Sequence, residues 1–480
     1  MDGSLPKLDR EVYREALRVE LERVVQEVAD AVDDAPAGRI IRDSEEKARD
    51  ALDRFRQMAY AKALQLKVDA AEAAFPPPRQ ATGQRQQNKG PQPYSVLTIN
   101  GRIHLRRTRW HDPAAGSCTP SDAWLDEAEA TISEGVREMC CRINQGATSF
   151  RQSSANLART AHLEISAETL RQVVEAEGQA VLRLFQQGEL SPEWTAADCA
   201  TESGVTRVYE GCDGVKARVV TDAEKKKRRA TIRQKRQQRG RKAQALPRLK
   251  SGADNAYKEF RIVHFYDESL KHRFVQATRG NHEATGRLMR RMGVQIDLAQ
   301  ADEKVALIDG APWIRNQIEL HGAMDAIGLD FYHLRDYAQK TRRVVFGPPA
   351  DPKDEAPSEG KQWLDQLMHT FRHEGYHAAW DRLTAWCSGL HKPAHREAAN
   401  HLLGYVAERR ELIQYPEFRA KDWQIGSGPT EAECKTTTQR LKGRGRRWDS
   451  DHVEALMALA CLDDSHLWPS YWTTLDPERN

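Results

Sequence analysis

The segment GCDGVKARVV, at residues 211–220, places Asp213 at the end of a run of strand-forming residues and directly before a glycine. The segment VALIDGAPW, at residues 305–313, repeats this arrangement around Asp309. Strand formers followed by Asp-Gly are typical of a strand end that opens into a turn. We therefore expect both aspartates to stand at the ends of β-strands.

A third acid, Glu431, lies in the segment GSGPTEAECK at residues 426–435, two residues after Pro429. Proline is common in the first turn of a helix, so we expect Glu431 to lie there. Taken singly, Asp213 and Asp309 fit ordinary Asp-Gly turns, and Glu431 fits a residue that complements the helix dipole. Taken together, carboxylates from three separate elements are what Mg²⁺ binds, and the sequence predicts a site for phosphoryl transfer.

Five sequence segments, taken together in their order along the chain, form a specific pattern, although each of them alone would be a weak signal. They are CDGVKARVV at 212–220, IDGAPWI at 308–314, DFYHLRDY at 330–337, GSGPTEAECK at 426–435 and RLKGRGRRWD at 440–449. On these segments the chain resembles the DDE transposases of bacterial insertion sequences, in the branch related to eukaryotic Mutator elements. The resemblance runs from about residue 94 to about residue 465.

The resemblance implies an α/β fold, with an RNase H-like mixed sheet, helices on both of its faces and a large helical insertion. It places Asp213 and Asp309 on adjacent strands and Glu431 on a later helix, where the three would hold two Mg²⁺ ions that Mn²⁺ can replace. It also implies a protein that binds the terminal inverted repeats of its element and catalyses DNA cleavage and strand transfer. Its expected partners are double-stranded DNA, at the element ends and the target, and further copies of itself in a homodimer or larger oligomer.

Changes in composition along the chain predict its domain organisation. The expected parts are an N-terminal helical arm at 1–75, a flexible linker at 76–93, a β-hairpin with helix-turn-helix-like DNA-binding helices at 94–200, a first catalytic part at 201–311 with a basic insert at 221–250, a helical insertion at 312–424, and C-terminal catalytic helices at 425–480. Asn100-Gly101 is a strong hairpin signal in the third part. Ser166 is expected to cap the second helix there.

Positive charge is concentrated next to Asp213. Residues 216–250 contain fifteen Lys and Arg against two acids, although the whole chain has a net charge of only +3. The stretch has almost no apolar residue to anchor it, so we expect it to be mobile without a partner and to contact DNA phosphates. A solvated charge run is the ordinary alternative. The candidate DNA-binding residues here are Lys226, Arg228, Arg229 and Arg236.

A second basic run follows Glu431 and ends in a tryptophan. Its candidate DNA-binding residues are Lys435, Arg440, Lys442, Arg444, Arg446, Arg447 and Trp448. We expect the cations to contact phosphates and Trp448 to stack on a base, against the alternative of a solvated helix end. His333, in the D-x-x-H segment, is a further candidate for the DNA-end pocket; a hydrogen-bonded core histidine is its alternative.

Two other functions fit parts of the sequence. One is a regulator that binds DNA without catalysing a reaction, for which Asp213, Asp309 and Glu431 need not all be present. A zinc metalloprotease is suggested by HEGYH at residues 373–377, because H-E-x-x-H on a helix can bind zinc with a glutamate as base. Gly375 weakens that helix, and no extended zinc motif follows.

The eight cysteines show no CxxC pair, so we expect reduced thiols, no disulfide framework and no zinc knuckle after the hairpin. The start of the chain lacks an apolar core, and no apolar run is long enough to cross a bilayer. The sequence therefore predicts no membrane association and, with the resemblance, a cytoplasmic protein at the bacterial nucleoid.

Overall fold

A computed structural model describes residues 5–125, 131–242, 254–347, 359–443 and 445–474. The chain is a mixed α/β protein that divides into two compact units, Met1–Val174 and Glu175–Asn480. The boundary falls inside a helix, so the DNA-binding region expected at 94–200 does not form one unit.

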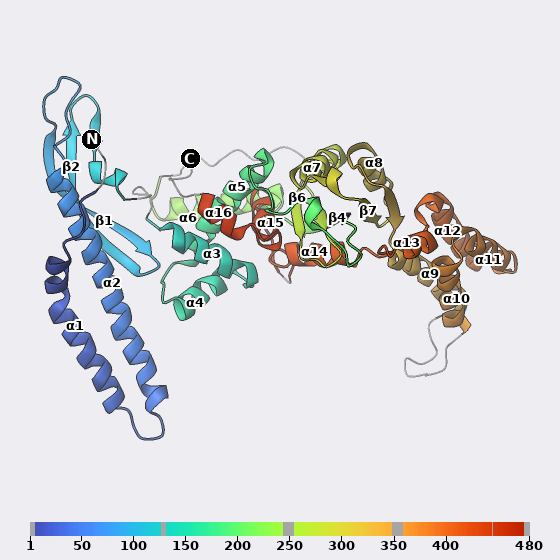
Figure 1. Cartoon of the computed structure of the whole chain (residues 1–480), viewed down its shortest axis with the longest axis horizontal. Helices are drawn as coiled ribbons and strands as arrows, with labels where there is room; N and C mark the ends of the chain where they lie inside the picture. The colour runs from blue at the N-terminus through green and yellow to red at the C-terminus, as the bar shows by residue number, and fades with distance from the viewer. Residues whose placement is uncertain (1–4, 126–130, 243–253, 348–358, 444, 475–480) are drawn as a thin grey trace. The chain divides into compact units, whose positions relative to one another are not determined.

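The first unit combines helices with a three-stranded antiparallel sheet in the order β1-β2-β3. Its elements are α1 (Arg10–Asp33), α2 (Ile40–Ala74), β1 (Gln87–Thr98), β2 (Gly101–Asp112), β3 (Gly116–Cys118), α3 (Glu134–Gly146), α4 (Phe150–Thr160) and the start of α5 (Ala167–Gln187). The hairpin predicted at Asn100-Gly101 is present, with Thr98 paired to Gly101. Helix α2 packs along β2, where the Gln65 amide bonds to both backbone groups of Arg106 (Figure 1).

The predicted linker at 76–93 and the predicted helix cap at Ser166 both lie in this unit. Strand β1 begins at Gln87, which pairs with His111, so the last part of the segment 76–93 is a strand and not a linker. The cap predicted at Ser166 is present, because its hydroxyl accepts a hydrogen bond from the Thr169 backbone at 3.0 Å.

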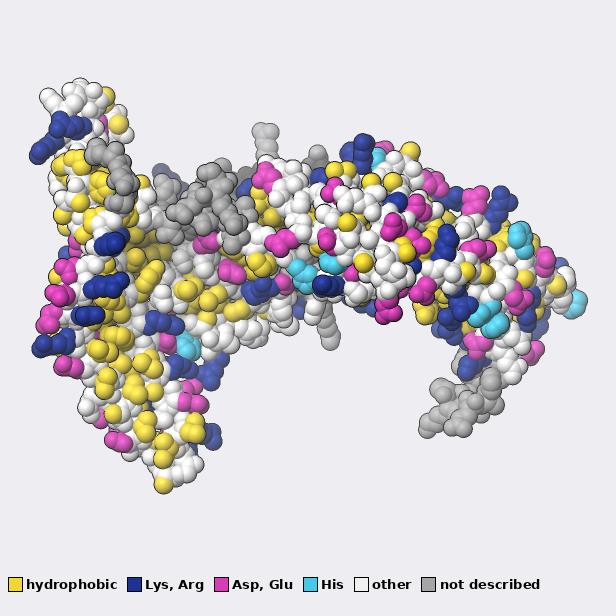
Figure 2. All heavy atoms as spheres, viewed as in Figure 1, with side chains coloured by type: hydrophobic (Ala, Val, Ile, Leu, Met, Phe, Trp, Pro, Cys, Tyr) yellow, Lys and Arg dark blue, Asp and Glu magenta, His cyan; other side chains and the backbone are white. Residues whose placement is uncertain are grey.

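The helical arm α1–α2 leaves large hydrophobic side chains exposed to solvent. Val19 is 71% exposed and Ile41 is 79% exposed. Figure 2 shows hydrophobic side chains following the length of this arm. Such a face is typical of a surface that another chain covers.

The second unit is built on a five-stranded sheet in the order β6-β5-β4-β7-β8. Its strands are β4 (Arg207–Arg218), β5 (Tyr257–Tyr266), β6 (Arg273–Thr278), β7 (Glu303–Ile308) and β8 (Ala326–Leu329). Strand β5 runs antiparallel to its neighbours β4 and β6. Strands β4, β7 and β8 run parallel to one another. β8 lies inside the segment 312–424, which the sequence predicted to be mostly helical with a loop at 347–360.

Helices cover both faces of this sheet. The helices of this unit that follow β4 are α6 (Asp222–Gln238), α7 (His282–Gln295), α8 (Pro312–His321), α9 (Phe331–Phe346), α10 (Glu359–His373), α11 (Tyr376–Ser388), α12 (Pro393–Glu408), α13 (Tyr415–Ala420), α14 (Gly428–Thr438), α15 (Ser450–Asp464) and α16 (Trp468–Thr474). Successive residues of a strand point to opposite faces. Gly211 of β4 faces Thr430 of α14, whereas the neighbouring Glu210 faces Gly322, just beyond α8.

The helices α9–α13 form the insertion between β8 and α14 (Figure 1). The insertion begins at Phe331, because the preceding α8 and β8 belong to the layers of the sheet. It returns to the sheet through α13, where Phe418 joins a buried cluster with Tyr209, Tyr266 and Trp423.

Part of the basic stretch after β4, Asp222–Gln238, forms the helix α6, which the sequence did not predict. The last part of the stretch, 243–250, lies outside the described residues. Thr221 and Glu224 make a reciprocal capping box that starts α6. This box supplies two hydrogen bonds that an isolated charged segment would lack. α6 buries none of its residues, so its cations surround a solvated helix.

Candidate active site

The pairing of two parallel strands, β4 and β7, determines the positions of Asp213 and Asp309 relative to each other. β4 and β7 pair with a constant offset of 96 residues, from Arg207 with Glu303 to Gly211 with Leu307. The same offset of 96 separates Asp213 from Asp309, so the register places them at one level of the sheet, just beyond the paired residues. Asp309 directly follows the end of β7, as predicted. Asp213 does not end its strand, because β4 continues to Arg218 through its pairing with β5.

The turn after Asp309 is fixed by local hydrogen bonds. Asp309 Oδ1 accepts from the Ala311 backbone at 2.8 Å. Gly310 has a φ of +85°, and its carbonyl accepts from Arg409 Nε at 3.0 Å. A Cβ at this position would lie 2.6 Å from Arg409 Nε, so only glycine allows both the left-handed turn and the arginine contact.

Glu431 is carried by α14, which lies very close to β4. A Cβ built on Gly211 would lie only 1.9 Å from Thr430 Oγ1, so the absence of a side chain there permits this approach. Glu431 stands in the first turn of α14, as predicted, and its Oε1 lies 3.3 Å from Nε2 of His333 on α9.

The electrostatics show that the predicted acids share one environment. Burial raises the pKa of Asp213, and the negative charges of Asp309 and Glu431 raise it further. The Gly214 backbone hydrogen bond and the charge of His333 act in the opposite direction. The structure therefore places Asp309, Glu431 and His333 near enough for their charges to act on Asp213. Among the described residues, the possible metal ligands that lie within 4.8 Å of one another are those of Asp330, His333 and Glu431.

This set of donors fits a hard divalent cation. Oxygen ligands from three carboxylates match the preference of Mg²⁺, and the mutual repulsion felt by Asp213 is what a bound cation would relieve. His333 faces Glu431, and its contact with DNA stays a prediction.

A fully buried acid lies three residues before Asp213. Glu210 has no exposed surface, and neither carboxylate oxygen has a hydrogen-bond partner among the described residues. Burial raises its pKa from 4.5 to about 8. Since the folded state keeps this proton to higher pH than the unfolded state, the free energy of unfolding falls as pH rises across that range.

We expect Glu210→Gln to remove this pH dependence, because glutamine stays neutral and has the same shape. The variant should match the wild type near pH 5 and exceed its free energy of unfolding by a few kcal/mol, roughly 3–5, at pH 8. Urea unfolding at the two pH values measures the difference. A difference that is the same at both pH values would contradict a raised pKa.

The run after α14 does not present all of its predicted DNA-binding residues to solvent. Trp448 is only 8% exposed, and its indole donates to the Leu441 carbonyl at 3.0 Å. Arg440 is 4% exposed, with its guanidinium 4.7 Å over the Trp448 ring. The expected stacking of Trp448 on a base does not hold in this structure, because protein atoms already cover the ring.

The other cations of the run have different surroundings. The Arg446 side chain donates to the carbonyls of Gln439, Arg440 and Lys442, which closes the end of α14. Lys435 and Lys442 are exposed. Arg444 lies outside the described residues.

Backbone pairing joins this run to the basic helix. Val220 donates to the Trp448 carbonyl at 2.8 Å, which continues β4 beyond its last residue. Arg447 pairs with Glu224, and Lys225 Nζ lies 3.0 Å from Asp449. The two basic segments are therefore held together, with Lys226 and Arg228 of α6 exposed and Arg229 and Arg236 partly buried.

The β1–β2 hairpin is also basic, and its sequence predicted either a contact along DNA or solvated arginines on a strand face. Residues 79–111, which include the β1–β2 hairpin, contain seven Lys and Arg and no Asp or Glu.

The HEGYH segment does not form the helix that a zinc metalloprotease requires. His373 ends α10, Gly375 has a φ of +89°, and His377 belongs to the next helix, α11. His373 Nδ1 accepts from Arg419 at 2.8 Å. The two histidines therefore do not lie one turn apart on a single helix.

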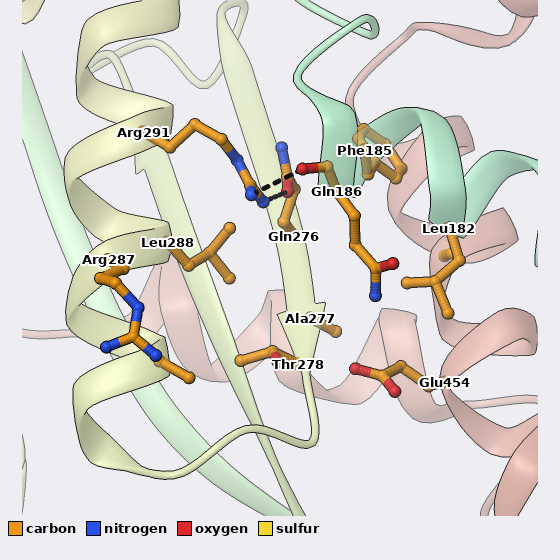
Figure 3. A pocket seen from close by; sticks show the side chains of 12 residues that line it. Leu182, Phe185, Gln186, Gln276, Ala277, Thr278, Arg287, Leu288, Arg291 and Glu454 are labelled. Carbon is orange, nitrogen blue, oxygen red and sulfur yellow. Dashed lines mark hydrogen bonds between the residues drawn. The ribbon is translucent and has the colours of Figure 1, made fainter.

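A separate cavity of about 230 Å³ lies between α5, β6, α7 and α15. In Figure 3, Arg291 reaches across it and donates to the Gln186 carbonyl and to Gln276 Oε1, both at 3.1 Å. These bonds tie the last turn of α5 to the sheet. The cavity contains none of the predicted site residues.

No protein-family model and no curated protein matches the chain. Among solved structures, the chain is similar to the Drosophila P element transposase strand transfer complex, with 11% sequence identity and a TM-score of 0.37. That match covers 71% of this chain and 94% of the other. Within the described residues, no helix is both long and apolar enough to cross a bilayer.

Proposed function

We propose that this protein is a DDE transposase with an RNase H-like catalytic domain. One observation carries the proposal: parallel pairing of β4 and β7 at a constant offset puts Asp213 and Asp309 at one level of a mixed sheet, where the charges of Asp309 and Glu431 both act on Asp213. The order β6-β5-β4-β7-β8, with only β5 antiparallel to its neighbours, supports the RNase H-like assignment.

Asp213, Asp309 and Glu431 would hold two Mg²⁺ ions, or Mn²⁺ in their place. Such ions lower the pKa of an attacking oxygen and stabilise charge on the leaving oxygen. In the proposed reaction, water attacks a phosphodiester at the element end and breaks the bond to the 3′ oxygen. The freed 3′ hydroxyl then attacks a target phosphodiester and displaces its 3′ oxygen, without a covalent protein intermediate.

The DNA partners are proposed from charge. The cations of α6 and the exposed lysines after Glu431 belong to the same unit as the acids, and the hairpin of the first unit adds a second basic surface. We assign them to the phosphates of the terminal repeats and the target. The exposed hydrophobic face of the α1–α2 arm supports self-association on DNA as a homodimer or larger oligomer.

Metal-dependent nicking of DNA tests the proposal. The substrate is a labelled duplex carrying the sequence that borders this gene, incubated with Mg²⁺ or with EDTA. We expect nicking that needs Mg²⁺ and is absent in Asp309→Asn. Binding of the duplex without nicking under either condition would favour the regulator.

The basic helix makes a separate prediction about salt. Neutralising Lys226 and Arg228 together should flatten the dependence of log K on log salt by about two units, because each phosphate contact accounts for nearly one. Binding to unrelated DNA sequences should weaken equally. The exposed pair Lys392 and Arg396, on or next to α12, is the matched control. An unchanged slope in the α6 variant would make the helix a solvated surface only.

A further inference from the structure

The carboxylate of Asp330, near the proposed active site, is buried and accepts three hydrogen bonds. It has no exposed surface. Its Oδ1 accepts from the His333 backbone at 2.6 Å, which caps α9. Its Oδ2 accepts from the Ser427 backbone and from the Ser427 hydroxyl, the latter at 2.8 Å.

The backbone around Asp330 reaches the remaining parts of the site. The Asp330 amide donates to the carbonyl of Ile308, the residue before Asp309, at 2.8 Å. The next amide, of Phe331, donates to Ile425 at 2.9 Å, just before α14. One dipeptide thus joins the end of β7, the start of α9 and the segment that leads into α14.

Two short connections complete the path to Glu431. Ser427 is the N-cap residue of α14, and its carbonyl accepts from the Glu431 backbone at 3.0 Å. His333, in the first turn of α9, lies 3.3 Å from the Glu431 carboxylate. Glu431 is therefore held through its backbone by way of Ser427 and through its side chain by His333, and Asp330 holds both.

We propose that Asp330 is a positioning residue that fixes Glu431 relative to Asp309. The proposal rests on the proposed function, since it concerns the same three acids. Asp330, His333 and Glu431 offer ligand atoms within 4.8 Å of one another, which resembles a metal site. The oxygens of Asp330, however, already accept three hydrogen bonds, and its charge faces the N-terminal ends of α9 and α14. These interactions stabilise a buried carboxylate without a metal.

Asp330→Asn tests this role, because the amide keeps the shape but turns one acceptor into a donor. The new NH₂ group would face either the Ser427 amide and hydroxyl or the His333 amide. Because it cannot accept hydrogen bonds, the bonds from those donors would be lost. A displacement of about 1 Å at a reacting group can cost on the order of a hundredfold in rate. We expect Mn²⁺ affinity and the nicking rate to fall about 10- to 100-fold, as for residues that orient metal ligands. DNA affinity should not change.

Asp267→Asn is the matched control. Asp267 is 5% exposed in the same unit and also accepts from a serine hydroxyl, Ser269 at 2.6 Å, and a backbone amide, His272 at 3.1 Å. It lies in the turn between β5 and β6, away from the three acids. Its variant should keep the Mn²⁺ affinity of the wild type even if its melting temperature falls.

Mn²⁺ titration of the DNA-free protein separates the outcomes. Weaker Mn²⁺ binding in Asp330→Asn, with the control unchanged, supports the positioning role. Wild-type Mn²⁺ affinity in Asp330→Asn, or equal loss in the control, overturns it. If Asp330→Asn does not fold, Ser427→Ala removes one of the three bonds, and we expect a several-fold loss; unchanged affinity there also overturns the role. A wild type that binds Mn²⁺ but never nicks DNA would count against the proposed function and leave this comparison intact.

Discussion

Strand cleavage is expected to fall by about a thousandfold or more when Asp213, Asp309 or Glu431 is replaced by alanine. Metal ions supply several kcal/mol of transition-state stabilisation, and each 1.4 kcal/mol is about tenfold in rate. Binding of the DNA end should remain, since phosphate contacts and not these acids supply affinity. A gel assay of nicking, paired with equilibrium binding to the same duplex, measures both.

The control for these variants is Glu397→Ala, an exposed acid on α12. It should leave nicking unchanged. Asp213→Ala should also raise the metal-free melting temperature at pH 7, because burial and two neighbouring acids disfavour its charge. This gain should disappear at a pH low enough to protonate Asp213 in both the folded and unfolded states. Wild-type nicking by any of the three variants would remove that residue from the site.

The second large effect is expected at Gly211. A methyl group there would overlap the Thr430 hydroxyl, whose Oγ1 lies 1.9 Å from the Cβ position, so α14 must move away from β4. Overpacking of this kind costs about 1–3 kcal/mol of folding free energy. Because Glu431 follows Thr430, we expect Gly211→Ala to lose nicking far beyond its loss of stability.

Gly404 provides the comparison, since a Cβ on this α12 residue meets nothing within 4 Å. Gly404→Ala should be neutral or stabilise by up to about 1 kcal/mol, as expected of glycine to alanine in a helix. Combining Gly211→Ala with Thr430→Ala should recover part of the stability, because the overlapping hydroxyl is gone. Normal nicking by Gly211→Ala would show that the close approach of α14 is not needed.

Local patterns predicted the elements that carry the acids. Strand formers before Asp-Gly located the end of β7 at Ile308, and Pro429 located the first turn of α14. These signals are contained in a few neighbouring residues, so the sequence alone can show them. The strand end predicted at Asp213 was wrong, because β4 continues to Arg218 and Asp213 pairs with Ile262 of β5. The shared offset of Asp213 and Asp309 depends on strand pairing, which one sequence does not specify.

The elements that were missed depend on weak or distant signals. β8 is only four residues long and contains Gly328, so its pattern is too short to recognise. α6 has no apolar face, but the capping box from Thr221 to Glu224 was visible in the sequence. Trp448 is buried because its backbone pairs with the end of β4, more than two hundred residues earlier in the chain. Asp330 was noted for its spacing to His333, whereas its contact with Ser427 is purely tertiary.

Binding of Mn²⁺ to the DNA-free protein tests most directly whether the three acids form one metal site. Titration followed by electron paramagnetic resonance should show saturable binding by the wild type that Mg²⁺ reverses. Asp213→Asn, Asp309→Asn and Glu431→Gln should each weaken it by more than about tenfold, since each removes a charged ligand. If the triple variant bound Mn²⁺ with the same affinity and stoichiometry as the wild type, the metal would lie elsewhere, and the proposed active site would be wrong.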